Sequence, residues 1–280
     1  MTERINFTGV ISVTNANPNG DPLNGNRPRQ DYAGYGEISD VCIKRKIRNK
    51  LMAMHYPIFL QADDMCNDGC RSLRERADKC KRLKRAKTAE AYAEIACEEW
   101  ADVRFFGQVF AFRRYPVTVG IRGPVSISPA FSLDLIDIAS NQITKSANAE
   151  PGSKKGHDTM GVRHRVPHAA YVFHGGISPQ LAQKTGFSDE DAEALQDAII
   201  GMFDDDYSSA RPMGSMVLAR LYWWRQKQVK YSPYQLQQAA LSFDSTDNWP
   251  YFTVRESFPA DLTPEVYDFS GVSQLGITAP

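Results

Sequence analysis

The residues most suggestive of chemistry follow the first strand-like run, in the stretch NANPNGDP at residues 15–22. Its three Asn at alternate positions, followed by Gly20, match the first half of a calcium-binding loop. Position twelve of such a loop is Asn26, and none of the side-chain ligand positions supplies the carboxylate that Ca²⁺ requires. We therefore expect no calcium, and interpret the stretch as a turn that offers amide donors to phosphate oxygens.

Two other sets of residues suggest metal or acid–base chemistry. His164 and His168 are four residues apart, which suits a metal pair on a helix, but Pro167 and the alternation that follows favour a strand. The five Cys are an odd number without a CxxC motif, which favours reduced thiols over disulfides. A zinc site from Cys66, Cys70 and Cys80 with His55 fits no common spacing. We therefore expect no metal.

Charge is strongly segregated although the net charge is zero. Residues 1–140 carry 21 Lys and Arg against 17 Asp and Glu, and residues 141–280 carry 12 against 16. Residues 40–87 hold 14 cations and 6 acids, whereas residues 182–206 hold 8 acids and a single Lys. This pattern favours a polyanion on one face and a complementary protein surface on another.

The elements that must position these charges follow from periodicity. Residues 5–13 alternate as a strand, and residues 40–54 form a helix capped by Ser39, with an inward stripe at every third or fourth position and cations off that stripe. Residues 60–101 read as an inserted helical segment, and residues 103–128 as strands. A ribbon, a strand, a capped helix at 189–202 and a last strand follow. Without insertions the order is βαββαβ, the α+β ferredoxin-like plan of RNA-recognition modules.

Five stretches together resemble one known family. They are NANPNGDPLNGNRPRQD, GEISDVCIKRKIRNKL, DVRFFGQVFAF, GIRGPVSIS and TMGVRHRVPHAAYVFHGGIS. In this order they resemble the CRISPR-associated Cas-seven family, the backbone subunit of Cascade, in its type I-C branch. The resemblance runs from the first strand to about Ser178. It implies one elaborated domain over residues 1–280, with an RRM-like palm, helical fingers at 60–101 and a thumb insertion at 132–165.

The family resemblance also implies a function and a set of contacts. Copies of such a subunit stack head to tail along a guide RNA, hold its phosphates and present it in segments for pairing with a target DNA strand. The resemblance assigns RNA contact to palm residues and to the thumb: Asn17, Asn19, Ser39, Lys44, Arg45, Arg48, Arg122, Met160 and Arg163. We further expect the acidic residues 189–206 to meet a basic surface of the next copy.

The resemblance implies partners but no catalysis. The expected partners are guide RNA, target DNA, neighbouring copies, members of the Cas-five and Cas-eight families, and a small subunit. No cofactor, metal, catalytic residue or membrane contact is expected, and the expected location is cytoplasmic. The alternatives are a metal-dependent ribonuclease of the same fold, for which Asp21, Asp31 and Asp40 are candidates, and a stand-alone RNA-binding module.

Overall fold

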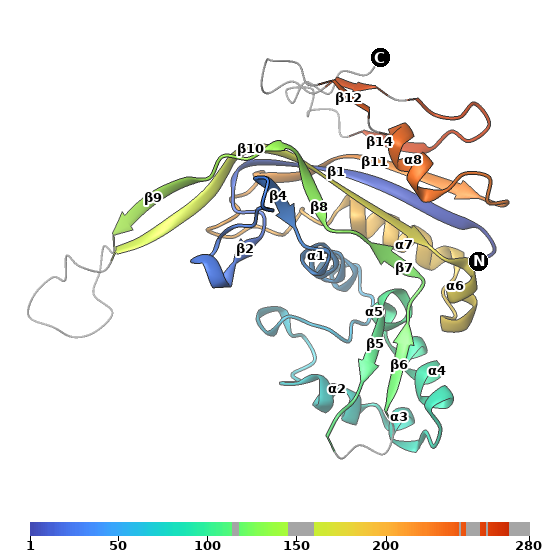
Figure 1. Cartoon of the computed structure of the whole chain (residues 1–280). Helices are drawn as coiled ribbons and strands as arrows, with labels where there is room; N and C mark the ends of the chain where they lie inside the picture. Colours follow the sequence, from blue (N-terminus) through green and yellow to red (C-terminus); the bar gives the residue numbers. More distant parts are fainter. Residues whose placement is uncertain (114–117, 145–159, 241, 245–252, 256, 269–280) are drawn as a thin grey trace, which may run out of the picture.

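A long antiparallel sheet forms the centre of the molecule (Figure 1). The computed structural model describes residues 1–113, 118–144, 160–240, 242–244, 253–255 and 257–268. Within them, eight strands form one sheet in the order β14-β11-β1-β10-β8-β4, with β7 and β9 also paired to β10. The strands of this sheet are β1 (Arg4–Ala16), β4 (Tyr35–Ile38), β7 (Val125–Ile127), β8 (Ala130–Leu135), β9 (Ala139–Thr144), β10 (Met160–Ile177), β11 (Met216–Gln226) and β14 (Glu265–Asp268).

Helices α1 (Asp40–Ala53) and α7 (Asp189–Ile200) lie side by side against one face of this sheet (Figure 1). The predicted cap of α1 is confirmed, because the Ser39 side chain accepts a hydrogen bond from the Cys42 amide. Ser188 begins α7 with a capping box. Seven of the inward residues predicted for these two helices are buried: Ile43, Ile47, Leu51, Ala192, Leu195, Ile199 and Met202. The eighth, Met54 after α1, is only partly buried.

The central strand β1 is buried on both faces. Phe7 stacks on Trp223 of β11 with ring centroids 5.1 Å apart, on the side covered by α1 and α7. Gly9 makes room for Phe173 of β10, since a Cβ at this position would lie 2.3 Å from that ring. Burying one such large side chain stabilises the fold by about 1.5–3 kcal/mol. On the opposite face, α8 (Pro233–Ala240) covers a smaller apolar cluster.

A second body of helices projects away from the sheet, at the bottom of Figure 1. We call residues 60–101 the helical insertion; it contains α2 (Leu73–Lys79), α3 (Lys81–Arg85) and α4 (Ala89–Glu99). With the hairpin of β5 (Gly107–Phe110) and β6 (Val119–Arg122) it buries its own apolar cluster around Phe59, Tyr92 and Phe110. The short elements in the connecting loops are β2 (Gly20–Asp21), η1 (Pro22–Asn24), β3 (Arg27–Pro28) and η2 (Asp63–Met65).

The prediction that a strand begins at Val103 is wrong. This residue lies in the helix α5 (Ala101–Phe106), and the strand β5 begins only after that helix. Ala101 and Phe105 pack into the main core, whereas Val103 packs into the core of the helical insertion. A short helix between two cores thus has apolar residues on opposite sides, and in the sequence this looks like the alternation of a strand.

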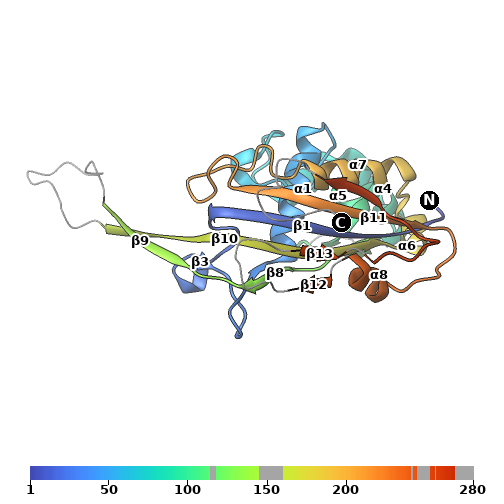
Figure 2. The same cartoon turned by 90° about the horizontal axis from the view of Figure 1, so that it is seen from above.

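A two-stranded ribbon extends from the other end of the sheet (Figures 1 and 2). It pairs β9 with the first residues of β10, from Met160 opposite Thr144 to Arg165 opposite Ala139. The predicted ribbon is therefore present, although residues 145–159 of the expected thumb lie outside the described residues. Because β10 runs unbroken from Met160, His164 lies within this strand and not before it as predicted.

The remaining described elements follow β10 in the chain. Helix α6 (Pro179–Thr185) precedes α7, and β12 (Ser242–Asp244) pairs with β13 (Thr253–Arg255). Strand β14 pairs with β11 at one edge of the main sheet. Among the described residues, no helix is both long and apolar enough to cross a membrane.

Candidate nucleic-acid interface

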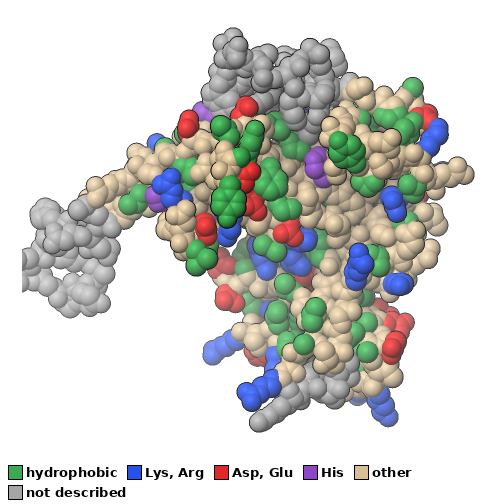
Figure 3. All heavy atoms as spheres, viewed as in Figure 1, with side chains coloured by type: hydrophobic (Ala, Val, Ile, Leu, Met, Phe, Trp, Pro, Cys, Tyr) green, Lys and Arg blue, Asp and Glu red, His purple; other side chains and the backbone are tan. Residues whose placement is uncertain are grey.

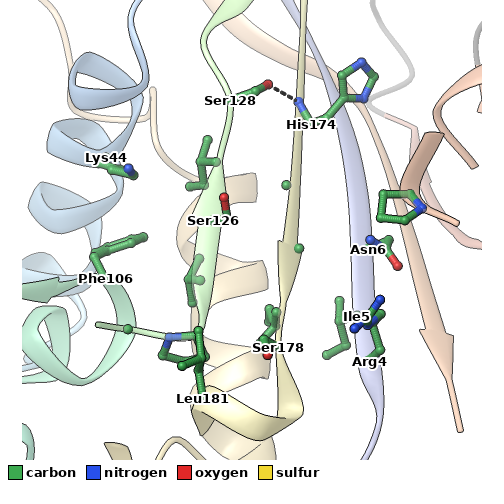
Figure 4. Close-up of a pocket in the computed structure, with 18 of the residues that line it drawn as sticks. Arg4, Ile5, Asn6, Lys44, Phe106, Ser126, Ser128, His174, Ser178 and Leu181 are labelled. Carbon is green, nitrogen blue, oxygen red and sulfur yellow. Dashed lines mark hydrogen bonds between the residues drawn. The ribbon is translucent and has the colours of Figure 1, made fainter. Parts of the chain in front are cut away.

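A groove runs along β7, a short strand of the sheet that pairs with β10 (Figure 4). It encloses about 550 Å³. Lys44 of α1 and Phe106 of α5 lie on one side of β7, and His174 of β10 lies on the other (Figure 4). We call this feature the β7 groove. It brings together Lys44 and Arg122, two of the residues predicted to contact RNA.

Strand β7 has a free edge that faces this groove. The hydroxyl-bearing Ser126 pairs with Gly176 of β10, while the Ser128 amide donates to the His174 carbonyl and the Pro124 carbonyl accepts from Ser178. Since antiparallel strands point alternate residues to alternate edges, the backbone groups of the intervening residues 125 and 127 point away from β10. No other described strand pairs with β7. The amides of residues 125 and 127 therefore have no hydrogen-bond partner among the described residues; both residues are only 5% exposed, so a ligand must enter the groove to accept from them.

The charges around the β7 groove have one sign. Its cations are Arg4, Lys44 and Arg122, and no Asp or Glu occurs among the described residues that line it. Lys44 makes an ion pair with Asp40, one turn earlier on α1, but remains partly exposed. Arg122 is exposed and makes no ion pair among the described residues. Figure 3 shows Lys and Arg side chains, with some Asp and Glu side chains beside them, between the sheet and the projecting helices. An anion fits this environment.

The NANPNGDP turn positions the start of α1 and is largely closed to a ligand. The Asn19 carbonyl Oδ1 accepts hydrogen bonds of 2.9 Å from both the amide and the hydroxyl of Ser39. Asn17 is buried and donates through Nδ2 to the Asn26 carbonyl. Asn15 adopts the left-handed conformation, with φ 52°. The stretch is therefore a turn, as predicted, but its side chains hold the turn against α1.

The expectation that Arg48 faces outward from α1 is wrong. Its Nε donates to Asp102 at 2.9 Å, both side chains are buried, and its guanidinium lies 4.8 Å from the ring centre of Phe106. Asp102 also accepts the amides of Phe59 and Leu60. Arg48 thus joins α1 to the base of the helical insertion. Its position could not be predicted because its partner lies 54 residues away.

The other predicted RNA contacts lie outside the β7 groove. Arg45 donates to the Leu60 carbonyl at 2.5 Å, and burial lowers the pKa of its guanidinium. Arg163 is exposed on the ribbon, opposite Asn141. Met160 is placed by its backbone pairing only. The RNA contacts of these residues stay predictions.

The three Asp considered for catalysis each bind a neighbouring group, and the five Cys form no disulfide. Asp21 caps η1 through Leu23, Asp31 accepts the amides of the turn that follows it, and Asp40 pairs with Lys44. All five Cys are free thiols, as predicted. Among the described residues, no group of three or more His, Cys, Asp or Glu side chains could hold a metal ion.

The sequence interpretation missed the polar residues of β7 and the histidine beside them. Ser126 is exposed on β7, and Ser128 accepts the His174 amide. His174 contacts Thr8 at 2.9 Å, and burial lowers its pKa to about 4, so it is neutral at pH 7. The strand itself lies within the residues 103–128 predicted as strands, and the signal that could have singled out its polar residues is the alternation Val-Ser-Ile-Ser at residues 125–128, shortly after Arg122.

Known proteins share the sequence pattern and the fold. The family model described as "CRISPR-associated protein Cas7" matches residues 3–256. A curated relative, the CRISPR-associated protein Cas7 of Haloferax volcanii, is 25% identical over 211 residues, which is 66% of this chain and 60% of the relative. The chain thus spans less than two thirds of that relative's length.

A solved structure has the same fold. It is titled "CRISPR RNA-guided surveillance complex, pre-nicking" and aligns with a TM-score of 0.52 at 12% identity, covering 79% of this chain and 78% of that one. The family model accounts for the N-terminal turn, α1, β7 and the ribbon within one continuous match. The chain therefore belongs to the Cas7 family of CRISPR-associated proteins.

Proposed function

We propose that this protein binds the sugar–phosphate backbone of a guide RNA along the β7 groove and serves as the repeated backbone subunit of a type I-C surveillance complex. The observation that carries the proposal is the combination of unpaired β-strand amides with Lys44 and Arg122 in a groove lined by no described carboxylate. Backbone amides and cations recognise phosphates without reading bases. A subunit that must accept any guide sequence needs such a site.

The sheet supports the palm of this proposal. If β7 and β8 are counted as one interrupted strand, the core reads βαββαβ, with β11, β1, β10 and β8 adjacent in that order. This is the order of a ferredoxin-like or RRM-like sheet. We propose that the helical insertion acts as fingers and the β9–β10 ribbon, within residues 132–165, as a thumb that reaches over the RNA of a neighbouring copy.

The partners follow from this arrangement. Successive copies bind head to tail along the guide, leaving base edges free to pair with a target DNA strand. The proposed additional partners are Cas-five and Cas-eight family proteins and a small subunit. The relative and the structural neighbour support a CRISPR context by their names. The proposed location is the cytoplasm.

We propose no catalytic role for the chain. The three Asp considered for a ribonuclease each have a local task, in a cap, a turn and an ion pair. We therefore expect Asp21→Ala to leave the integrity of bound RNA unchanged in the presence of Mg²⁺. Cleavage of bound RNA that requires Mg²⁺ and disappears in this variant would contradict the proposal.

The test is binding to two guide-length single-stranded RNAs of unrelated sequence, followed by light scattering for copy number and by gel electrophoresis for RNA integrity. We expect equal affinity, several copies per RNA and intact RNA. The double variant Lys44→Glu/Arg122→Glu should lose affinity about 100-fold or more, because two cations that face phosphate become anions.

The matched control is Lys184→Glu/Lys227→Glu, which reverses two exposed cations outside the β7 groove. The proposal is wrong if both double variants lose the same affinity, or if affinity depends strongly on RNA sequence. A single copy on a long RNA would favour the stand-alone RNA-binding module.

A further inference from the structure

A fully exposed tyrosine stands on a rigid turn between β3 and β4. Tyr32 has a relative exposure of 112%, so its side chain is open to solvent. The turn is fixed by Asp31, whose Oδ1 accepts the amides of residues 33, 34 and 35, each at 2.9 Å. We call residues 31–34 the Tyr32 turn; it stands out from the plane of the sheet in Figure 2. A preorganised aromatic residue of this kind binds with little loss of entropy.

The surface next to the Tyr32 turn is apolar with an acidic edge. A Cβ on Gly34 would lie 3.5 Å from Leu135 of β8, so the turn is beside that exposed residue. Tyr35 pairs with Leu135, and Phe131, also exposed, pairs with Glu37. The nearby acids are Glu37, Asp134 and Asp137, none of which makes an ion pair among the described residues. In Figure 3, hydrophobic and acidic side chains adjoin on this part of the molecule.

The acids decide the class of partner. Carboxylates beside an exposed aromatic residue repel the phosphates of nucleic acid, so a stacking platform for bases is disfavoured. A protein surface with cations around an apolar hollow is complementary. The partner must therefore offer both a recess for an aromatic side chain and unpaired basic residues.

This chain carries such a surface on the helical insertion. Next to α2 lies a hollow of about 270 Å³ whose apolar lining residues are Leu60, Cys66, Cys70 and Leu73. Its polar lining residues are Arg45, Gln61, Asp63, Arg71, Ser72 and Arg76. We call it the α2 hollow. Arg71 at its edge is exposed and makes no ion pair through its side chain among the described residues. Nearby α3 adds three exposed cations. Lys81 and Lys84 make no ion pair among the described residues, and Arg82 pairs only with the surface residues Glu98 and Glu99.

We propose that Tyr32 of one copy inserts into the α2 hollow of the next copy, with Glu37 and Asp134 facing Arg71. The hollow also contains Asp63, which can accept a hydrogen bond from the phenol of Tyr32. Because the two surfaces are different, the contact is heterologous and repeats along a row of copies. This inference rests on the proposed head-to-tail assembly and names the surfaces that form it.

Disulfide trapping tests the contact directly in the full chain. Tyr32→Cys, incubated with oxidised glutathione at high protein concentration, with and without single-stranded RNA, should form covalent dimers and longer ladders with the native Cys66 of a neighbour. Tyr234→Cys, at a tyrosine of 68% exposure on α8, is the matched control. We expect at least tenfold more covalent dimer from Tyr32→Cys, and loss of that excess when Cys66→Ser is added.

Equal trapping in the two variants, or trapping that persists without Cys66, would overturn the contact. A second variant, Tyr32→Asp, separates the contact from RNA binding. We expect it to bind one copy per short RNA with wild-type affinity and to lose cooperative filling of a long RNA. Unchanged cooperative filling by Tyr32→Asp would also overturn the contact. If the wild-type protein does not bind RNA at all, the proposed function is contradicted, and disulfide trapping in the absence of RNA still tests the contact.

Discussion

Helix α1 supplies cations to two hollows, and the two differ in the acids that line them. No Asp or Glu is among the described residues that line the β7 groove, and Lys44 there makes an ion pair with Asp40 of its own helix. The second hollow, of about 540 Å³ between α1 and the 201–211 loop, is here called the α1 hollow. Its charged lining residues are Arg45, Lys46, Lys50 and Arg211 together with Asp64, Asp205 and Asp206. Basic residues on one helix therefore become either a binding surface or internal ion pairs, depending on acids that come from distant segments.

The ion pairs of the α1 hollow change the expected role of the acidic segment 189–206. Buried Lys46 pairs with Asp206, which also accepts Arg211 Nε at 3.0 Å, and Lys50 pairs with Asp204 at 2.6 Å. Burial lowers the pKa of the Lys46 ammonium. Asp204 and Asp206 thus fasten the loop after α7 to α1. We no longer propose these two carboxylates as the surface that meets the next copy.

The largest effect is expected where a buried cation of α1, Arg48, pairs with a fully buried acid. Asp102→Ala removes the partner of Arg48 and leaves its guanidinium uncompensated, which should lower the free energy of unfolding by about 3–5 kcal/mol. Urea denaturation followed by circular dichroism measures this loss.

The control replaces both charges at once. Arg48→Met/Asp102→Leu removes the need for charge pairing, so it should be markedly more stable than Asp102→Ala. If the double variant is less stable than Asp102→Ala, the loss of stability comes from losing the ion pair itself and not from leaving the Arg48 charge unpaired.

A smaller effect is expected at the β7 groove, from protonation of His174. Burial lowers its pKa to about 4, whereas an unfolded histidine titrates near 6.5. The unfolded chain therefore binds the proton more readily, and the stabilisation present above pH 6.5 is lost as the pH falls toward 4. The loss should not exceed about 3 kcal/mol. Urea denaturation at several pH values measures it.

His174→Gln should remove this part of the pH dependence, while His168→Gln, exposed on the same strand, should retain it. An unchanged pH dependence in His174→Gln would show that the buried imidazole does not set acid stability.

The smallest effect is expected at the exposed pair of the α1 hollow. Asp204→Asn breaks the bond to Lys50, but the Asp204 side chain is 62% exposed. The free energy of unfolding should change by less than about 1 kcal/mol, and RNA affinity should not change. A larger loss of stability, or a loss of assembly on RNA, would restore this acid as an interface residue.

Local pattern predicted much of the fold, and long-range pairing accounts for what it missed. Caps, periodicity and alternation located β1, α1, α7 and β11, because these signals depend on neighbours in the chain. The helix α5 was missed because it serves two cores at once. At the site, Lys44 and Arg122 line the same groove, and their contact with RNA stays a prediction. The burial of Arg48 was missed because it depends on Asp102, which no local pattern connects to it.

The most direct test of the β7 groove is the salt dependence of single-stranded RNA affinity. In this measurement each phosphate contact contributes about 0.7 to the slope of log K against log salt concentration. Lys44→Met/Arg122→Met should therefore reduce the slope by about 1.4, and Lys184→Met/Lys227→Met should leave it unchanged. Equal slopes for wild type and Lys44→Met/Arg122→Met would show that these cations do not face phosphate, and would contradict the proposed RNA path.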